Sequence, residues 1–405
     1  MATRISCRYF TSINQTLHYK KSHSRPCSSL SSSTFTFLTQ QHHNPLVYKI
    51  HRSRSSPNSS IAQPQHSHKH KHKLLSPPPM ASASKEVSTE ILPYIRVYKD
   101  GTVERLLKIP TVPPSPCDPE TGISSKDITV SLNPPISARL YLPDVTANQN
   151  NQKLPILIYF HGGGFCVESS SSILTHRYLN RLVSEAKILA VSVEYRLAPE
   201  NPLPIAYEDC WVALNWVASH LNRDENNGID KDPWLVSHGD FDRLYIGGDS
   251  AGANIAHNIA IRAGTERLPN DVKILGAFLC LPYFYSSKPI GSEPVEGFEK
   301  TFSYVIWNFV YPSAPGGVDN PKLNPVGAGA PSLAGLGISR LFVCVGGEDD
   351  LKDRGIWYCN AVRESGWKGE LEFVEFEGEN HGFNILKLDT DNSKNLIKRL
   401  ASFLV

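Results

Sequence analysis

The sequence predicts an α/β fold with a mostly parallel central sheet and flanking helices. From residue 80 onward, short runs rich in β-branched and aromatic residues alternate with segments whose apolar residues recur at helical spacing. This alternation is typical of parallel strands joined by crossover helices. The chain has 405 residues, of which 40% are hydrophobic and 20% charged, so it can bury a large core.

The predicted strands are short β-rich runs, and they cover residues 138–143, 155–160, 188–195, 243–248, 274–284, 340–347 and 371–378. Two segments between them, residues 206–221 and 250–263, are predicted as helices from the spacing of their apolar residues. A stretch rich in Gly and Pro, from about residue 285 to 338, interrupts the alternation. Together with the segment before residue 135, it is expected to form a lid over a functional site.

Residues 1–79 differ in composition from the rest of the chain. They contain 11 Lys and Arg residues and no Asp or Glu, and they lack the apolar core of a secretory signal. This composition resembles a transit peptide, which would direct the protein to a plastid (chloroplast). The alternative is that residues 1–79 are a disordered upstream extension that is not always translated, in which case the protein begins at Met80 and is cytoplasmic. In both cases, residues 80–405 are expected to form the folded domain.

Charge and cysteine usage exclude several classes of partner. Residues 80–405 hold 30 basic and 39 acidic side chains, so we expect no nucleic-acid partner. No run of 18 apolar residues predicts a membrane span. The 8 Cys are scattered without a C-x-x-C pair, which is typical of buried free thiols in a reducing compartment. The tract HSHKHKHK (66–73) is interpreted as low-complexity leader, and no metal site is predicted.

Ser250 is the candidate nucleophile. Gly248-Asp249-Ser250-Ala251-Gly252 joins a predicted strand to a predicted helix, which matches the G-x-S-x-G turn that exposes a nucleophilic serine. Glycine is needed at both ends because bulkier residues there would collide with the neighbouring strand and helix. The alternative is a helix N-cap serine after a glycine turn, but the strand before it and the helix after it favour the nucleophile.

A second glycine motif follows the predicted strand at 155–160. It reads His161-Gly162-Gly163-Gly164-Phe165, and three glycines let backbone N–H groups approach a substrate carbonyl. The expected oxyanion donors are Gly163, Gly164 and Ala251. His161 is expected to stabilise the loop, and Phe165, Cys166 and Val167 are expected to wall the site. A phosphate-binding loop is the alternative, but the G-K-[ST] ending is missing.

His381 is the candidate general base. It follows the last predicted strand in the string GENHGF, and a neutral imidazole can accept the Ser250 proton near neutral pH. Among the other five His residues after the leader, His257 lies within the helix after Ser250 and is interpreted as a core residue. His176, His220 and His238 do not follow a strand.

The acid that orients the base must lie in the loop after the preceding strand. This loop offers Glu348, Asp349, Asp350 and Asp353. The carboxylate has to hold the imidazole in the correct tautomer, so it must lie close to the strand end, which favours Asp349 or Asp350. Asp353 is expected to begin the following helix, where its charge complements the helix dipole.

These residues resemble the hormone-sensitive-lipase-like serine hydrolases, and within them the plant carboxylesterases. The matching strings are HGGGF (161–165), VEYRLAPENPLP (193–204), HGDF (238–241), GDSAGANIAHN (248–258), DDLKDRG (349–355) and NHGF (380–383). They span most of residues 90–405 in the family's order. The resemblance implies an α/β-hydrolase fold. In that family the acid heads a D-x-L-x-D string, which selects Asp349 here.

The resemblance implies hydrolysis of small-molecule carboxylic esters through an acyl-enzyme, with no metal and no cofactor. Three related functions remain as alternatives. Tuliposide-converting enzymes are similar, share an intact triad and a plastid leader, and transfer the acyl group within one molecule. Isoflavanone dehydratases resemble the chain but carry Thr at the position of Ser250. Gibberellin receptors of this branch have lost the base that His381 supplies. The acyl specificity and a homodimer are left open.

Overall fold

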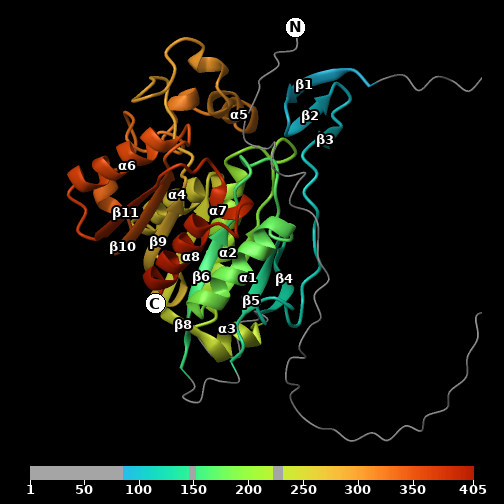
Figure 1. The fold of residues 1–405 in the computed structure, drawn as a ribbon, viewed down its shortest axis with the longest axis vertical. Helices are drawn as coiled ribbons and strands as arrows, with labels where there is room; N and C mark the ends of the chain where they lie inside the picture. The colour runs from blue at the N-terminus through green and yellow to red at the C-terminus, as the bar shows by residue number, and fades with distance from the viewer. Residues whose placement is uncertain (1–84, 146–151, 222–230) are drawn as a thin grey trace, which may run out of the picture. The chain divides into compact units, whose positions relative to one another are not determined.

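The computed structural model describes residues 85–145, 152–221 and 231–405. An eight-stranded sheet runs through this part of the chain in the order β11-β10-β9-β8-β6-β7-β5-β4 (Figure 1). Strands β6 to β11 pair in parallel, whereas β5 is antiparallel to both β4 and β7. The predicted mostly parallel sheet is therefore confirmed. Its strands are β4 (Ser124–Leu132), β5 (Pro135–Leu142), β6 (Leu154–Phe160), β7 (Leu189–Glu194), β8 (Gly239–Asp249), β9 (Ile274–Cys280), β10 (Arg340–Gly346) and β11 (Glu370–Phe376).

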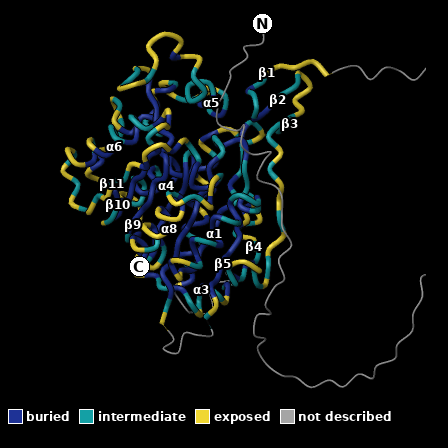
Figure 2. The backbone as a smooth tube through the Cα atoms, viewed as in Figure 1, coloured by how far each residue is buried: buried dark blue, intermediate teal, exposed yellow. Residues whose placement is uncertain are grey.

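Helices cover both faces of this sheet, as expected for parallel strands. The α-helices are α1 (Ile173–Ala186), α2 (Ile205–Ser219), α3 (Pro233–His238), α4 (Ala251–Ala263), α5 (Phe302–Val310), α6 (Lys352–Glu364), α7 (Phe383–Leu386) and α8 (Asp391–Phe403). Side chains of α1, α7 and α8 form one apolar cluster with strand residues such as Leu157 and Tyr159. Side chains of α2, α4 and α6 form the other cluster with Ile156 and Ile158. Figure 2 shows the strands between these helices as the most buried part of the chain.

The differences from the predicted strands have local causes. The run at 274–284 was expected to be one strand, but β9 ends at Cys280. Leu281 has a φ of 52°, so the backbone leaves the extended conformation there. The edge strand β4 was not predicted, because buried, intermediate and exposed residues interchange along it and its sequence contains few apolar residues.

Two segments outside the main sheet meet beside its carboxyl-terminal edge. The first is a small antiparallel sheet of β1 (Val87–Ile91), β2 (Ile95–Tyr98) and β3 (Val103–Arg105). The second contains α5, which lies within the Gly- and Pro-rich stretch. The rings of Tyr94 and Phe302 stack with centroids 4.6 Å apart and join the two segments. Short 3-10 helices lie at Pro269–Asp271, Phe298–Lys300, Gly317–Asp319 and Leu333–Gly335.

None of the helices described by the structure has the length and apolar character needed to cross a membrane. The predictions for residues 1–79, including the His-containing tract at 66–73, concern residues outside the described part of the chain.

Candidate active site

Ser250 occupies a sharp turn between β8 and α4. Its backbone has a φ of 53° and a ψ of −114°, a conformation that a serine rarely adopts. A Cβ atom on Gly248 would lie 2.3 Å from the carbonyl oxygen of Phe160, and one on Gly252 would lie 1.9 Å from the same oxygen. The turn therefore requires glycine at both positions because β6 lies directly against it. The first residue of α4 is Ala251, so its N–H group lies beside the serine.

Three side chains from three separate loops form a hydrogen-bonded line. The Nε2 atom of His381 lies 2.8 Å from the Oγ of Ser250, and its Nδ1 lies 2.8 Å from Oδ2 of Asp349. The second carboxylate oxygen of Asp349 accepts a hydrogen bond from the N–H of Leu351 at 2.9 Å. Each end of the imidazole therefore has a partner, which fixes the ring between serine and carboxylate.

The structure shows which of the candidate acids contacts His381. Asp349 is buried and contacts His381, whereas Asp350 and Glu348 are exposed. Asp353 lies in the first turn of α6, where it accepts hydrogen bonds at 2.6 Å from the N–H and the hydroxyl of Ser292. The position of Asp353 in the helix agrees with its expected role there, and it also binds the loop before α5.

Burial and the neighbouring carboxylate have opposite effects on the pKa of His381. Burial disfavours the charged imidazolium, but the adjacent charge and hydrogen bond of Asp349 favour it and outweigh burial. The pKa of His381 is therefore raised above its usual value of 6.5. A base with a raised pKa accepts the serine proton more readily.

Asp249 is a buried acid beside Ser250. The sequence motifs assigned no role to it. It accepts a hydrogen bond from the hydroxyl of Tyr159, and burial raises its pKa to about 6. A Cβ on Gly162 would lie 2.4 Å from Oδ2 of Asp249. Asp249, the second residue of the G-x-S-x-G motif, thus packs against the first glycine of the HGGG loop and links the two motifs.

The glycine loop after β6 approaches the nucleophile through backbone conformations that favour glycine. Gly163 has a φ of 90° and Gly164 has a φ of 59°. A Cβ on Gly163 would lie 2.2 Å from the carbonyl oxygen of Val167. Both glycines line the same cavity as Ser250 and His381. The backbone of this loop therefore borders the same cavity as Ser250.

His161 packs against this loop and does not line the cavity. Its ring is fully buried and stacks on Tyr195, with centroids 4.2 Å apart. The hydroxyl of Tyr195 donates a hydrogen bond at 2.7 Å to the carbonyl oxygen of His161, and the His161 Nδ1 lies 3.0 Å from the carbonyl oxygen of Gly162. This geometry agrees with the structural role expected for His161.

Only one of the three residues expected to wall the site lines the cavity. Val167 lines the cavity, whereas Phe165 and Cys166 are fully buried and are not among its lining residues. The ring of Phe165 packs among Tyr207, Tyr283 and Trp307 in the core. Burial raises the pKa of the Cys166 thiol to about 12. The left-handed backbone at Phe165, with a φ of 61°, helps to direct its side chain away from the cavity.

The lid segments complete the cavity. Apart from Ser250, His381 and the glycine loop, its walls are mostly apolar and come from Tyr94, Leu107, Ile109, Val167, Leu174, Leu281, Tyr283, Phe302, Ile306, Leu351, Ile385 and Leu386. Glu168, Thr175 and Ser303 add polar groups. No sequence motif identified Tyr94, Phe302 or Ile306, because distant segments bring these residues together only in the folded chain.

The remaining His residues lie away from this cavity. His257 is buried in α4, where its Nδ1 lies 3.0 Å from the Tyr358 hydroxyl, and burial lowers its pKa to about 3. This is the core role that the sequence predicted for it. Among the described residues, no group of three His, Cys, Asp or Glu side chains has a metal-binding arrangement.

Comparison with known proteins agrees with this architecture. A family model described as the α/β-hydrolase fold matches residues 157–385. The chain is 27% identical to a solved hyperthermophilic esterase from the archaeon Pyrobaculum calidifontis, with a TM-score of 0.54 over 69% of this chain and 84% of that structure.

Curated plant relatives match over 81% to 98% of their length. The chain is 59% identical over 324 residues to a 2-hydroxyisoflavanone dehydratase from Glycyrrhiza echinata, covering 80% of this chain and 98% of the relative. It is 41% identical over 325 residues to probable carboxylesterase 2 from Arabidopsis thaliana, covering 80% and 98%. It is also 40% identical over 330 residues to the chloroplastic tuliposide A-converting enzyme 1 from Tulipa gesneriana, covering 82% and 81%.

Proposed function

The chain belongs to the α/β-hydrolase fold family, as a plant member of its hormone-sensitive-lipase-like branch, and we propose that it is a serine carboxylesterase acting on small-molecule carboxylic esters. One observation carries the proposal: the hydrogen-bonded line from Ser250 through His381 to Asp349 opens into a largely apolar cavity. This arrangement supports nucleophilic attack on a carbonyl carbon.

In the first step, the Oγ of Ser250 attacks the ester carbonyl while Nε2 of His381 takes its proton. Asp349 stabilises the imidazolium that forms. The N–H groups of Gly163, Gly164 and Ala251 stabilise the negative oxygen of the tetrahedral intermediate. His381 then gives its proton to the departing alcohol, which leaves the acyl group on Ser250.

In the second step, His381 takes a proton from water, and the resulting hydroxide attacks the acyl carbonyl. The same N–H groups stabilise the second tetrahedral intermediate. Collapse of that intermediate releases the carboxylic acid and returns the proton to Ser250. No metal and no cofactor takes part in this sequence.

A turnover screen tests this function. Residues 80–405 are assayed on p-nitrophenyl esters of increasing acyl length, with the products identified by mass. We expect free acid and p-nitrophenol in equal amounts, and a serine-directed organophosphate should label Ser250. Adduct formation at a different residue would contradict the mechanism.

The strong likeness to a 2-hydroxyisoflavanone dehydratase supports a second candidate, the loss of water from a hydroxyl group β to a carbonyl. His381 would remove the proton from the carbon between them, and the glycine N–H groups would stabilise the enolate oxygen. The carbon–oxygen bond would then break, and the proton held by His381 would pass to the departing hydroxide, which leaves as water.

The two reactions differ in their need for a nucleophile. Ester hydrolysis requires covalent attack by Ser250, whereas dehydration requires only a base and the oxyanion donors. Ser250→Ala should therefore abolish ester hydrolysis, while His381→Ala should abolish both activities. If Ser250→Ala protein dehydrates a 2-hydroxyisoflavanone at the wild-type rate and wild-type protein hydrolyses no ester, dehydration replaces our first proposal.

The likeness to a tuliposide A-converting enzyme raises the question of the acyl acceptor. We propose water. In ¹⁸O-labelled water, the acid product should then carry the label, and added small alcohols should divert only a minor share of the acyl group. Unlabelled lactone as the main product of a glycosyl ester would identify an internal hydroxyl as the acceptor instead.

We also propose that residues 1–79 direct the protein to a plastid and that residues 80–405 form the catalytic domain. The basic, acid-free composition of residues 1–79 and the chloroplastic relative support this location. Fusion of residues 1–79 to a fluorescent protein tests it. Plastid fluorescence is expected, and uniform cytosolic fluorescence would support translation from Met80.

A further inference from the structure

Glu168 is among the residues that line the active-site cavity, and it follows the glycine loop by four positions. One of its oxygens, Oε2, accepts hydrogen bonds from the hydroxyls of Ser172 at 2.5 Å and Thr175 at 2.9 Å, and from the N–H of Ser169 at 3.3 Å. These three donors belong to the loop before α1 and to the first turn of that helix. They orient the side chain without using its second oxygen.

The second oxygen, Oε1, has no hydrogen-bond partner in the described part of the structure, although the protein shields it from solvent. None of the basic side chains in the described residues forms an ion pair with Glu168. A buried acceptor without a donor has a large desolvation cost, and a donor that reaches it gains a charge-assisted hydrogen bond.

The backbone at Glu168 gives an independent reason to look for a role. Its φ is 80°, in the left-handed region where a residue with a side chain is strained and glycine is not. A glycine would relieve this strain and leave the turn possible. The glutamate side chain therefore has a contribution that offsets the strain, and three hydrogen bonds to one oxygen use only half of its acceptor capacity.

We propose that Glu168 is a specificity-determining residue: when its carboxylate turns toward the cavity, its free oxygen accepts a hydrogen bond from a hydroxyl or ammonium group of the substrate. This inference rests on the proposed esterase function. The expected substrate is mostly apolar, because leucine, isoleucine and aromatic side chains form most of the cavity wall. The substrate also carries one hydrogen-bond donor group away from its ester carbonyl, and Glu168 binds this donor.

Matched esters test the proposal. The acyl set is the p-nitrophenyl esters of six- to ten-carbon acids ending in a methyl, hydroxyl or ammonium group, and the alcohol set is acetate esters of alcohols with the same three ends. For the wild-type protein at pH 7, kcat/KM should be about tenfold or more higher for a donor-bearing ester than for its methyl partner in at least one set. A preference confined to ammonium esters identifies a cationic substrate, and one shared by hydroxyl esters identifies a neutral donor.

Glu168→Gln is the informative variant. The glutamine oxygen can still accept from Ser169, Ser172 and Thr175, while its amide nitrogen replaces the free acceptor with a donor. The variant should lose about tenfold or more in kcat/KM for the preferred esters and less than threefold for the methyl esters. Glu168→Gly, which relieves the backbone strain, should lose the same preference.

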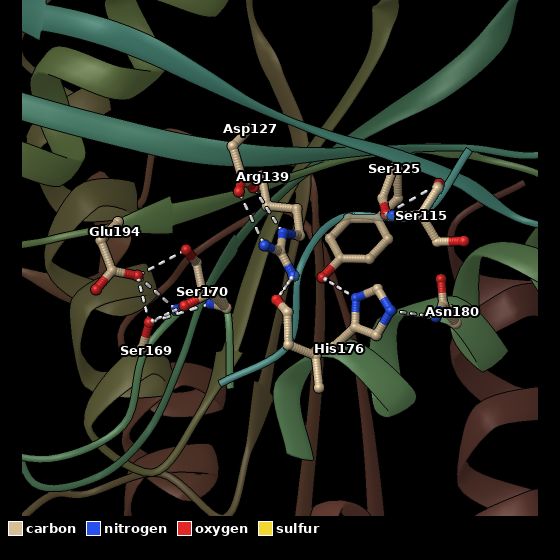
Figure 3. Close-up of polar contacts among 12 residues, drawn as sticks. Ser115, Ser125, Asp127, Arg139, Ser169, Ser170, His176, Asn180 and Glu194 are labelled. Carbon is tan, nitrogen blue, oxygen red and sulfur yellow. Dashed lines mark hydrogen bonds and ion pairs between the residues drawn. The ribbon is translucent and has the colours of Figure 1, made fainter. Parts of the chain in front are cut away.

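Glu194, the last residue of β7, provides a matched control because its carboxylate contacts the same serine-rich loop. Its Oε2 accepts hydrogen bonds from the hydroxyls of Ser169 and Ser170 and from the N–H of Ser170 (Figure 3). Glu194 is not among the residues that line the cavity in the described part of the chain. Glu194→Gln should therefore keep the wild-type preference for donor-bearing esters.

Calorimetric titration of unreacted ester pairs into Ser250→Ala protein separates the two proposals, because this binding needs no hydrolysis. Tighter binding of the donor-bearing ester that is lost in the Ser250→Ala, Glu168→Gln protein supports the role of Glu168, even if wild-type turnover fails. Equal binding of all esters to the Ser250→Ala protein would overturn it. An equal loss on every ester in both Gln variants would also overturn it, since that result indicates a purely structural role.

Discussion

The Nε2 atom of His381 lies 2.8 Å from the Oγ of Ser250, although 131 residues separate them in the sequence. The serine is held by a turn after β8 and the histidine by a loop after β11, with β9 and β10 between these strands in the sheet. Parallel strands bring their carboxyl ends to one edge, so loops far apart in sequence meet there. The acid on the loop after β10 completes the line.

Removal of either end of this hydrogen bond should abolish ester hydrolysis. Ser250→Ala and His381→Ala should each lower kcat by about 10³-fold or more, and the double variant should lose little more because the residues act as a unit. Steady-state kinetics on a p-nitrophenyl ester measures the loss, and circular dichroism verifies the fold. Additive losses would show that the two side chains act independently.

Substitution of Asp349 and of Asp350 should have very different effects on kcat. Asp349→Asn should lower kcat by about 10³ to 10⁴-fold, since Asn cannot stabilise the imidazolium and favours the wrong tautomer. Asp350→Asn should change kcat less than about threefold, because its side chain is exposed and the His381 Nδ1 already pairs with Asp349. If Asp350→Asn were the impaired variant, the acid assignment would be wrong.

Activity should depend on pH through His381. Only the neutral imidazole can accept the serine proton, so kcat/KM should fall as the pH drops through the raised pKa of His381. The inflection should lie above pH 6.5. Because the Asp349 charge opposes the effect of burial, Asp349→Asn should move the inflection of its residual activity to lower pH. An unchanged inflection would indicate that another group titrates.

The turn around Ser250 should not tolerate a side chain at position 252. Gly252→Ala would bring a Cβ to 1.9 Å from the carbonyl oxygen of Phe160, where the contact is with backbone. We expect a loss of about 2 to 4 kcal/mol in the free energy of unfolding, together with lower kcat. Gly366→Ala is the control for the assay: its Cβ would meet no atom within 4 Å, although a φ of 83° strains it. Equal stability of the two variants would contradict the close contact.

Local sequence determined the strand, sharp turn and helix around Ser250, because the glycines on both sides meet steric needs that arise within a few residues. It also determined the glycine loop at 162–164 and the loop positions of His381 and the acids, since apolar runs mark the strands before them. Residue chemistry alone left Asp349 and Asp350 open. The family resemblance selected Asp349, and the tertiary structure brings that carboxylate to the imidazole.

Tertiary structure alone decided which side chains face the cavity. Tyr94 and Phe302 stack at 4.6 Å from opposite parts of the chain, and no local pattern encodes such a contact. Phe165 was expected at the cavity wall, but its backbone turns the ring into the core. Glu168 was not singled out, because its free oxygen results from where Ser169, Ser172 and Thr175 donate. Backbone sterics act locally and can be read from neighbouring residues, whereas burial and hydrogen-bond partners depend on segments that only folding brings together.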